Sequence, residues 1–87
     1  MPILNSKYME AEEIIFPRER KTKAWAISNR SYGDTLAIVI WLPAWRQYVF
    51  RPFGGTEFSA DCLAAVVEFL RQANAEHKQK QKEPIHV

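Results

Sequence analysis

A run of seven apolar residues from Leu36 to Leu42 is the strongest pattern in this sequence of 87 residues. A strand sends alternate side chains to opposite faces, so both faces of a strand over this run are apolar. The members of one face are Leu36, Ile38, Ile40 and Leu42, and those of the other are Ala37, Val39 and Trp41. One helix can bury one face. The other face then needs a second cover from an N-terminal segment, a second copy of the chain or a ligand.

A short strand is predicted before this run, over residues 24–29. Trp25 and Ile27 lie two positions apart and therefore share one face. Residues 30–34 have the composition of a turn, in which Gly33 tolerates a positive φ. The two strands are expected to be neighbours in one sheet.

A third strand is predicted over residues 45–51, where an aromatic and apolar pattern resumes after Pro43 and stops at Pro52. A connection this short joins antiparallel strands, so the second and third strands should form a hairpin. The sequence is compatible with more than one register for this hairpin.

The register depends on the length of the turn. If only residues 43–44 form the turn, Val39 faces Tyr48. If Trp45 joins the turn, Ile40 faces Tyr48 instead. A slip of one residue exchanges the faces of a strand, so the sequence alone leaves open which aromatic side chains are core.

The N-terminal part has no clean period before the apolar residues 14–16, which stop at Pro17. This part fits either an edge strand or a short helix that begins near Lys7. The edge strand is favoured, because β-branched residues prefer strands and proline is tolerated at an edge.

A long helix is predicted from Ser59, which fits the N-cap, with Asp61 in the first turn. Phe58 and Leu63 have the spacing of a hydrophobic staple. A polar stretch follows, which Pro84 terminates. The stripe expected to pack on the sheet consists of Leu63, Val66, Val67, Leu70 and Ala73, widened by Ala65 and Phe69.

These elements predict an α+β fold. Its sheet is a three-stranded antiparallel meander, or four-stranded if the N-terminal segment pairs, with one C-terminal helix packed on one face. At 87 residues the chain should be a single domain. We expect a variable N-terminal segment over residues 1–20, a sheet-plus-helix core over 23–78 and a flexible polar tail over 79–87.

Composition and charge set further bounds. A hydrophobic fraction of 47% and a charged fraction of 25% are typical of a globular protein. The net charge is only +2, but positive charge is in clear excess between residues 17 and 30. Cys62 is the only cysteine, which excludes an intrachain disulfide and favours a reducing compartment. No signal peptide and no apolar run of membrane-spanning length is present, so a cytoplasmic protein without a membrane partner is expected.

The sequence predicts no catalytic residue, cofactor, metal site or small-molecule substrate, and hence no enzyme. Cys62 would need a base to act as a nucleophile, but the only histidines are His77 and His86 in the polar end. A packing role for Cys62 is favoured. The acidic group in residues 10–13 has no histidine or calcium-loop spacing beside it, and residues 54–55 lack the lysine of a phosphate loop.

Cations and aromatic residues alternate along residues 45–51. Such a surface can contact phosphates and stack bases. The favoured alternative is that the aromatic rings pack in the core while the arginines reach water. The candidate nucleic-acid or partner surface consists of Arg46, Tyr48 and Arg51, flanked by Arg18, Arg20, Lys21, Lys23 and Arg30.

Residues 21–78, about two thirds of the chain, resemble a group of small uncharacterised proteins encoded by bacteriophages and prophages. The resemblance rests on the strand with Trp25, the hairpin string Trp41-x-x-x-Trp45-Arg46-Gln47-Tyr48-x-Phe50, and the Cys62-Leu63 helix that ends near Glu76-His77-Lys78. That group more often has a polar or basic residue at the position of Ile40, so this face is unusually apolar here. The resemblance implies a bacterial cytoplasmic setting and a mobile-element origin, and it implies no activity.

Two functional hypotheses follow. The first is a non-enzymatic interaction protein that forms a symmetric homodimer through the second sheet face, with Ile38, Ile40 and Leu42 in the contact. The second is a nucleic-acid-binding accessory protein that uses the arginine and aromatic surface. The cover of the second face is either residues 14–16 of the same chain or another copy.

Overall fold

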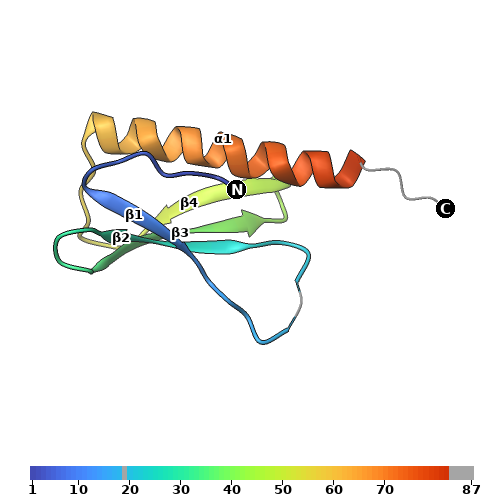
Figure 1. The fold of residues 1–87 in the computed structure, drawn as a ribbon, viewed down its shortest axis with the longest axis horizontal. Helices are drawn as coiled ribbons and strands as arrows, with labels where there is room; N and C mark the ends of the chain where they lie inside the picture. Colours follow the sequence, from blue (N-terminus) through green and yellow to red (C-terminus); the bar gives the residue numbers. More distant parts are fainter. Residues whose placement is uncertain (19, 83–87) are drawn as a thin grey trace.

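In a computed structural model, which describes residues 1–18 and 20–82 and the side chains up to residue 79, four strands and one helix form two layers (Figure 1). The sheet is antiparallel and its strand order, β1-β2-β3-β4, follows the chain. This is the predicted α+β fold, with the N-terminal segment as the fourth strand. The elements are β1 (Met9–Glu13), β2 (Ala24–Asn29), β3 (Thr35–Leu42), β4 (Gln47–Pro52) and α1 (Ala60–Lys82).

The N-terminal edge strand lies earlier than the apolar residues 14–16. β1 alternates between the buried Met9 on the helix side and exposed glutamates on the other side. Ile14 adds one more backbone bond, from its N–H to the carbonyl of Ala24 at 2.8 Å. Ile15 is already 82% exposed. The strand follows the alternating pattern, because period-2 alternation and not a continuous apolar run is what a half-covered edge needs.

The β2–β3 hairpin has the predicted turn. Gly33 has a φ of 77° and donates its N–H to the carbonyl of Asn29 at 2.7 Å. The Asn29 side chain accepts the amides of Ser31 and Tyr32 at 2.8 and 3.2 Å. The positive φ of Gly33 is the feature that predicted this turn, and the Asn29 side chain adds local backbone bonds that were not predicted.

The β3–β4 register differs from both predicted registers. Trp41 lies opposite Tyr48, and Val39 lies opposite Phe50. The register differs by two residues from that of the two-residue turn, so Val39 and Tyr48 still share a face although they are not directly opposite. The sequence prediction missed the length of the turn.

This turn contains four residues, 43–46. The amide of Trp45 bonds the carbonyl of Leu42 at 3.1 Å, and that of Arg46 bonds the carbonyl of Pro43 at 3.2 Å. Arg46 closes the turn with a φ of 53°, a conformation that glycine or asparagine usually supplies. The strand predicted over residues 45–51 is β4, which begins at Gln47. The prediction that Trp45 and Arg46 belong to this strand is therefore wrong.

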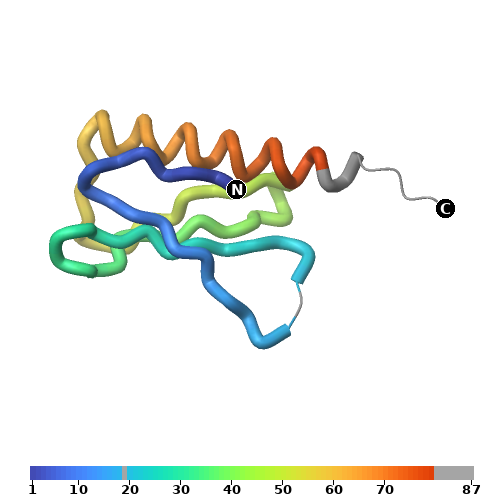
Figure 2. The backbone as a smooth tube through the Cα atoms, in the orientation of Figure 1, coloured from blue at the N-terminus to red at the C-terminus, as the bar shows by residue number. Residues whose placement is uncertain are grey.

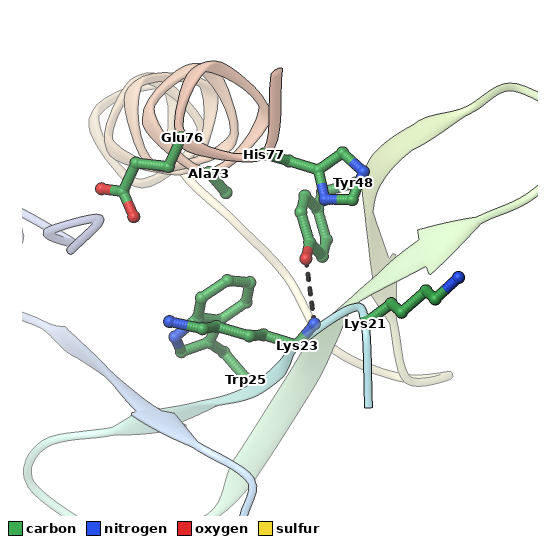
Figure 3. A pocket seen from close by; sticks show the side chains of 7 residues that line it. All are labelled: Lys21, Lys23, Trp25, Tyr48, Ala73, Glu76 and His77. Carbon is green, nitrogen blue, oxygen red and sulfur yellow. Dashed lines mark hydrogen bonds between the residues drawn. The ribbon is translucent and has the colours of Figure 1, made fainter. Parts of the chain in front are cut away.

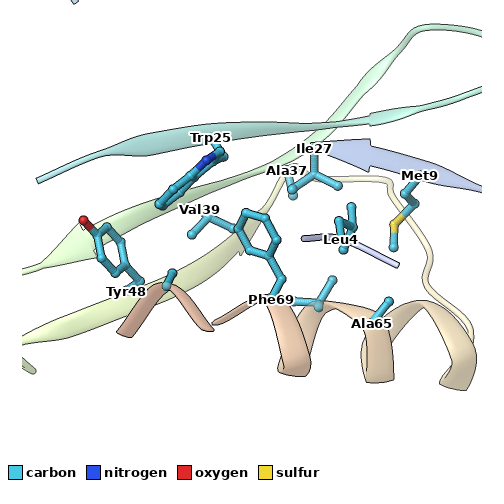
Figure 4. Close-up of a cluster of buried hydrophobic side chains, with 11 residues drawn as sticks. Leu4, Met9, Trp25, Ile27, Ala37, Val39, Tyr48, Ala65 and Phe69 are labelled. Atoms are coloured by element: carbon cyan, nitrogen blue, oxygen red, sulfur yellow. The ribbon is translucent and has the colours of Figure 1, made fainter. Parts of the chain in front are cut away.

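The core lies between α1 and one face of the sheet (Figure 4). Phe69, 1% exposed, meets the ring of Trp25 edge-on at a centroid distance of 5.2 Å, and Trp25 meets Tyr48 at 5.3 Å. Ala37 and Val39 of β3 are fully buried beneath these rings. Burying a side chain of this size contributes about 1.5 to 3 kcal/mol, so these contacts hold the helix on the sheet.

The helix begins as predicted, but its buried stripe is rotated. Ser59 Oγ accepts the amide of Cys62 at 3.2 Å, which confirms the N-cap. Leu63 and Val67 are each 45% exposed, so their prediction as core residues is wrong. Phe58, expected to form a staple with Leu63, packs on the ring of Phe50 at 5.1 Å.

The rotation follows from the size of Phe69. Ala65 and Ala73 lie four residues before and after it on the same face, and both are buried. Small residues at these positions allow the helix to approach the sheet closely enough for Phe69 to reach Trp25. The buried helix residues are Ala65, Val66, Phe69 and Ala73, with Cys62 and Leu70 partly buried.

The first residues lie along the helix side of the molecule (Figure 2). Leu4 is part of the buried core, Ile3 donates its amide to Gln72 Oε1 at 2.9 Å, and the amino group of Met1 lies 2.9 Å from Glu76. α1 continues through residues 79–82, part of the predicted tail, whereas Pro84 and His86 lie outside the described residues. No helix in the described part combines the length and the apolar character of a membrane span.

Candidate interaction surfaces

The face of the sheet opposite α1 is here called the open face. By register, one row runs straight across all four strands, from Glu12 through Ala26 and Ile38 to Arg51. The row has an acid at one end, a base at the other and an apolar centre. A parallel row places Ala24, Ile40 and Val49 side by side, and Leu42 extends the apolar centre.

The open face is apolar yet only half-buried. Ile38, Ile40, Leu42 and Val49 all stay partly accessible, whereas Ala37 and Val39 on the other face of the same sheet are 0% exposed. Neighbours within one sheet shield a side chain from the sides, and only a second layer completes its burial. Ile15 does not contribute to that layer, because it is 82% exposed, and Ile14 stays only partly buried at the margin.

Both edges of the sheet are partly closed. On the outer side of β1, Met9 donates its amide to Ser6 Oγ at 3.2 Å and its carbonyl accepts Arg30 Nε at 3.1 Å. On the outer side of β4, Asn74 Oδ1 accepts the amide of Tyr48 at 2.6 Å, and its Nδ2 reaches back to the Tyr48 carbonyl at 3.5 Å. Partly closed edges disfavour pairing with another strand, and the open face is a surface that remains for association.

The predicted arginine and aromatic surface is not assembled on the sheet. Tyr48 is 4% exposed and belongs to the core, as the favoured alternative expected. Arg46 lies in the turn, Arg51 is on the open face, and Arg30 is held by the carbonyls of Ser6 and Met9, each at 3.1 Å. These side chains occupy different parts of the molecule.

The loop between β1 and β2 carries the remaining predicted cations. It extends from the sheet away from α1 (Figure 1) and bears Arg18, Arg20, Lys21 and Lys23. Arg20 stacks over the ring of Phe16 at 4.1 Å from its centroid. The loop is therefore a basic feature that belongs to a different segment of the chain than Arg46.

A small cavity of about 80 Å³ lies where this loop returns to the sheet, and it is lined in part by Lys21, Lys23 and His77 (Figure 3). The two lysine side chains point in different directions and do not converge on one point. The amide of Lys23 donates to the phenol oxygen of Tyr48 at 2.9 Å. Burial raises the pKa of Tyr48, and the hydrogen bond from Lys23 opposes that rise only in part.

A groove, here called the hairpin–helix groove, runs between the β3–β4 hairpin and residues 67–78 of α1. Trp45 of its lining is 67% exposed, and the ring of Trp41 lies against the ring of His77 at a centroid distance of 4.2 Å. The apolar lining includes Trp41, Trp45, Phe50, Val67 and Leu70, and the cationic lining is Arg46, Arg71 and Lys78. Sequence reasoning missed this groove because it assigned Val67 to the core and Trp45 to a strand.

Within residues 1–18 and 20–82, no group of three histidine, cysteine or acidic side chains lies close enough to hold a metal ion. Cys62 is a free, partly buried thiol near the helix start. The fold and its surfaces thus define a small α+β sheet-plus-helix protein with an uncovered apolar face and an adjacent groove. Comparisons with protein-family models, curated proteins and solved structures find no match to this chain.

Proposed function

We propose that this protein is a non-enzymatic interaction protein that forms a symmetric homodimer through the open face of its sheet. The observation that carries the proposal is the row from Glu12 to Arg51. A second copy of this row, placed over the first in the opposite direction, matches it in charge and in side-chain size. Consider a twofold axis that lies between two stacked sheets, parallel to the strands and centred between β2 and β3. That axis places β1 over β4 of the partner and β2 over β3 of the partner.

Charge and size then match along the row. Glu12 lies over Arg51 of the partner subunit, and Ile38 lies over Ala26 of the partner subunit. The neighbouring row repeats the match of large over small, with Ile40 over Ala24 of the partner subunit. Opposed large and small residues interdigitate, and opposed charges at the rim fix the orientation of the two copies.

The area of the open face determines how stable a dimer we expect. Four strands spaced by about 4.8 Å, with about six residues each at 3.3 Å, span roughly 20 Å by 20 Å. This is small beside the surface of about 800 Å² that each partner buries in a stable complex. We therefore expect a dimer that dissociates on dilution into folded monomers.

Sedimentation velocity over a dilution series tests the proposal. A mass that falls from dimer to monomer on dilution is the expected result, and a monomer at all concentrations up to the millimolar range contradicts it. Ile38→Asp should abolish the dimer, because it buries an unpaired carboxylate between the sheets. Glu68→Arg, an exposed change on the helix side, is the control and should leave the mass unchanged.

The orientation is tested by exchange of charge. Glu12→Arg and Arg51→Glu should each weaken the dimer, since like charges then face each other at two symmetric positions. The double variant restores both pairs and should recover most of the association. A double variant that is weaker than either single variant would contradict the proposed axis while leaving a dimer through this face intact.

The basic loop carries a second candidate function, contact with nucleic-acid phosphates. Arg18, Arg20, Lys21 and Lys23 follow one another closely in the sequence of a loop that extends from the sheet, and cations of this kind can contact phosphates. Electrophoretic shifts at low salt on duplex and single-stranded DNA test this function. Retention of binding in a variant with all four cations changed to glutamine would contradict it.

The setting implied by the phage resemblance belongs to the same proposal. A homodimeric accessory protein of a mobile element, in the bacterial cytoplasm, is consistent with the free thiol of Cys62. Fractionation of a bacterial host that expresses the chain tests the compartment.

A further inference from the structure

We propose that the hairpin–helix groove binds an acidic, amphipathic segment of a partner protein. Its cationic lining is Arg46, Arg71 and Lys78, and no acidic side chain contributes to the described lining. Arg71 pairs only loosely with Glu68, at 3.8 Å on the exposed side of the helix. A pair of this kind contributes little, so a partner carboxylate can replace it.

The aliphatic part of the groove lining favours a protein segment over a nucleic acid. Val67 and Leu70 contribute aliphatic surface, which packs against apolar side chains but offers bases neither a stacking plane nor a hydrogen bond. The indole of Trp41 is occupied by His77, so Trp45 is the aromatic ring of the lining that stands 67% exposed. One ring with aliphatic neighbours fits an apolar anchor of a peptide.

The bound segment should be helical and not an added strand. A peptide that extends β4 needs free amides on its outer edge. The amide of Tyr48 already bonds Asn74, and Pro52 has no amide to offer. Association therefore depends on side chains, as when an amphipathic helix lies in an apolar groove.

The backbone of Arg46 is a second observation that points to this groove. A non-glycine residue at positive φ costs stability, and such residues concentrate at functional sites. Glycine would relieve the strain at this position but would remove the cation. The chain thus keeps an unfavourable backbone conformation at an arginine that lines the groove.

Fluorescence anisotropy with labelled synthetic peptides tests the proposal. The probe is an amphipathic peptide with leucines on one helical face and glutamates elsewhere, and its partner probe has lysines in place of the glutamates. We expect the acidic peptide to bind at least about tenfold more tightly than the basic peptide. Equal binding of the two peptides, or no binding of the acidic peptide, would overturn the proposal.

Variants locate the site. Trp45→Ala and Arg46→Gly should each weaken binding of the acidic peptide by about tenfold or more, while Arg46→Gly raises the free energy of unfolding. Tyr32→Ala and Arg18→Gly change an exposed aromatic residue and an exposed arginine elsewhere, and they should bind like the wild type. Loss of affinity in both pairs, or in neither, would contradict the assignment to this groove.

A single-stranded oligothymidine probe separates the competing occupant. Tighter binding of this probe than of the acidic peptide, with sensitivity to Trp45→Ala, would assign the groove to nucleic acid and overturn the proposal. The dimer mass serves as an independent readout, because Trp45 lies in the turn before β4 and takes no part in the paired rows of the open face. Trp45→Ala should leave that mass unchanged.

Discussion

The two faces of β3 differ in what covers them and hardly in how apolar they are. β3 contributes Ala37 and Val39 to the face under α1, where both are fully buried, and the larger Ile38 and Ile40 to the open face, where both stay partly accessible. The covered face takes small aliphatic residues because the rings above it fill the space. Burial here depends on the second layer and not on the hydrophobicity of the strand.

The largest loss of stability is expected from a change on the face of the sheet that α1 covers. Phe69→Ala removes the ring that contacts Trp25 and should lower the free energy of unfolding by about 3 to 5 kcal/mol. Urea denaturation monitored by circular dichroism measures this change. Val67→Ala, two residues away and 45% exposed, is the matched control and should cost less than about 1 kcal/mol. Similar losses in both variants would contradict the helix orientation.

Adjacent residues of β3 then separate the two faces. Val39→Ala should cost about 2 kcal/mol at every protein concentration, because it leaves a cavity in the core. Ile40→Ser should instead act on association. In the wild type the midpoint of unfolding should rise with protein concentration, and Ile40→Ser should remove that rise. A concentration dependence that survives Ile40→Ser would show that association uses another surface.

A smaller loss of stability is expected from a change at the outer edge of β4. Asn74→Ala leaves the amide of Tyr48 without its partner at 2.6 Å and should cost about 1 to 2 kcal/mol. The dimer mass of the folded protein should not change, since the open face is untouched. Gln79→Ala, also on α1 but exposed, serves as the control. Growth of larger assemblies in Asn74→Ala alone would show that the edge had been limiting association.

The smallest effect at neutral pH concerns Tyr48, at the end of the covered layer. Burial raises its pKa above the ordinary value of 10.0, so the folded state holds the phenol proton more tightly than the unfolded state. This contribution to stability is complete below pH 10 and is lost as the pH rises through the folded pKa. Tyr48→Phe should lose the bond from Lys23 and show a shallower decline in alkaline denaturation. An unchanged alkaline decline would contradict this assignment.

The sequence determined the elements better than their contacts. β2, β3, the turn at Gly33 and the N-cap at Ser59 depend on local patterns, and each lies where it was predicted. The side of the helix that faces the sheet was not predicted correctly. Two adjacent apolar stripes run along the helix, and only the tertiary contact of Phe69 with Trp25 decides which of them is buried.

The groove and the open face also depend on features that local sequence patterns do not determine. An arginine in the left-handed backbone conformation has no signature in the local sequence. The four-residue turn that ends at Arg46, and the groove beside it, were therefore not predictable. The alternation that made β3 apolar on both faces was readable without a structure. Which residues sit opposite one another, and hence the row from Glu12 to Arg51, required the register.

Asn74 has a consequence for the order of folding during synthesis. Its side-chain amide takes the place of a neighbouring strand at Tyr48, yet it belongs to the helix that follows the whole sheet in the chain. A nascent sheet without α1 therefore has both an uncovered apolar face and an unprotected edge, the two features that promote aggregation. The chain should be most vulnerable to aggregation between the emergence of β4 and the docking of residue 74. Ribosome-stalled chains that end before this residue should need a chaperone to stay in solution.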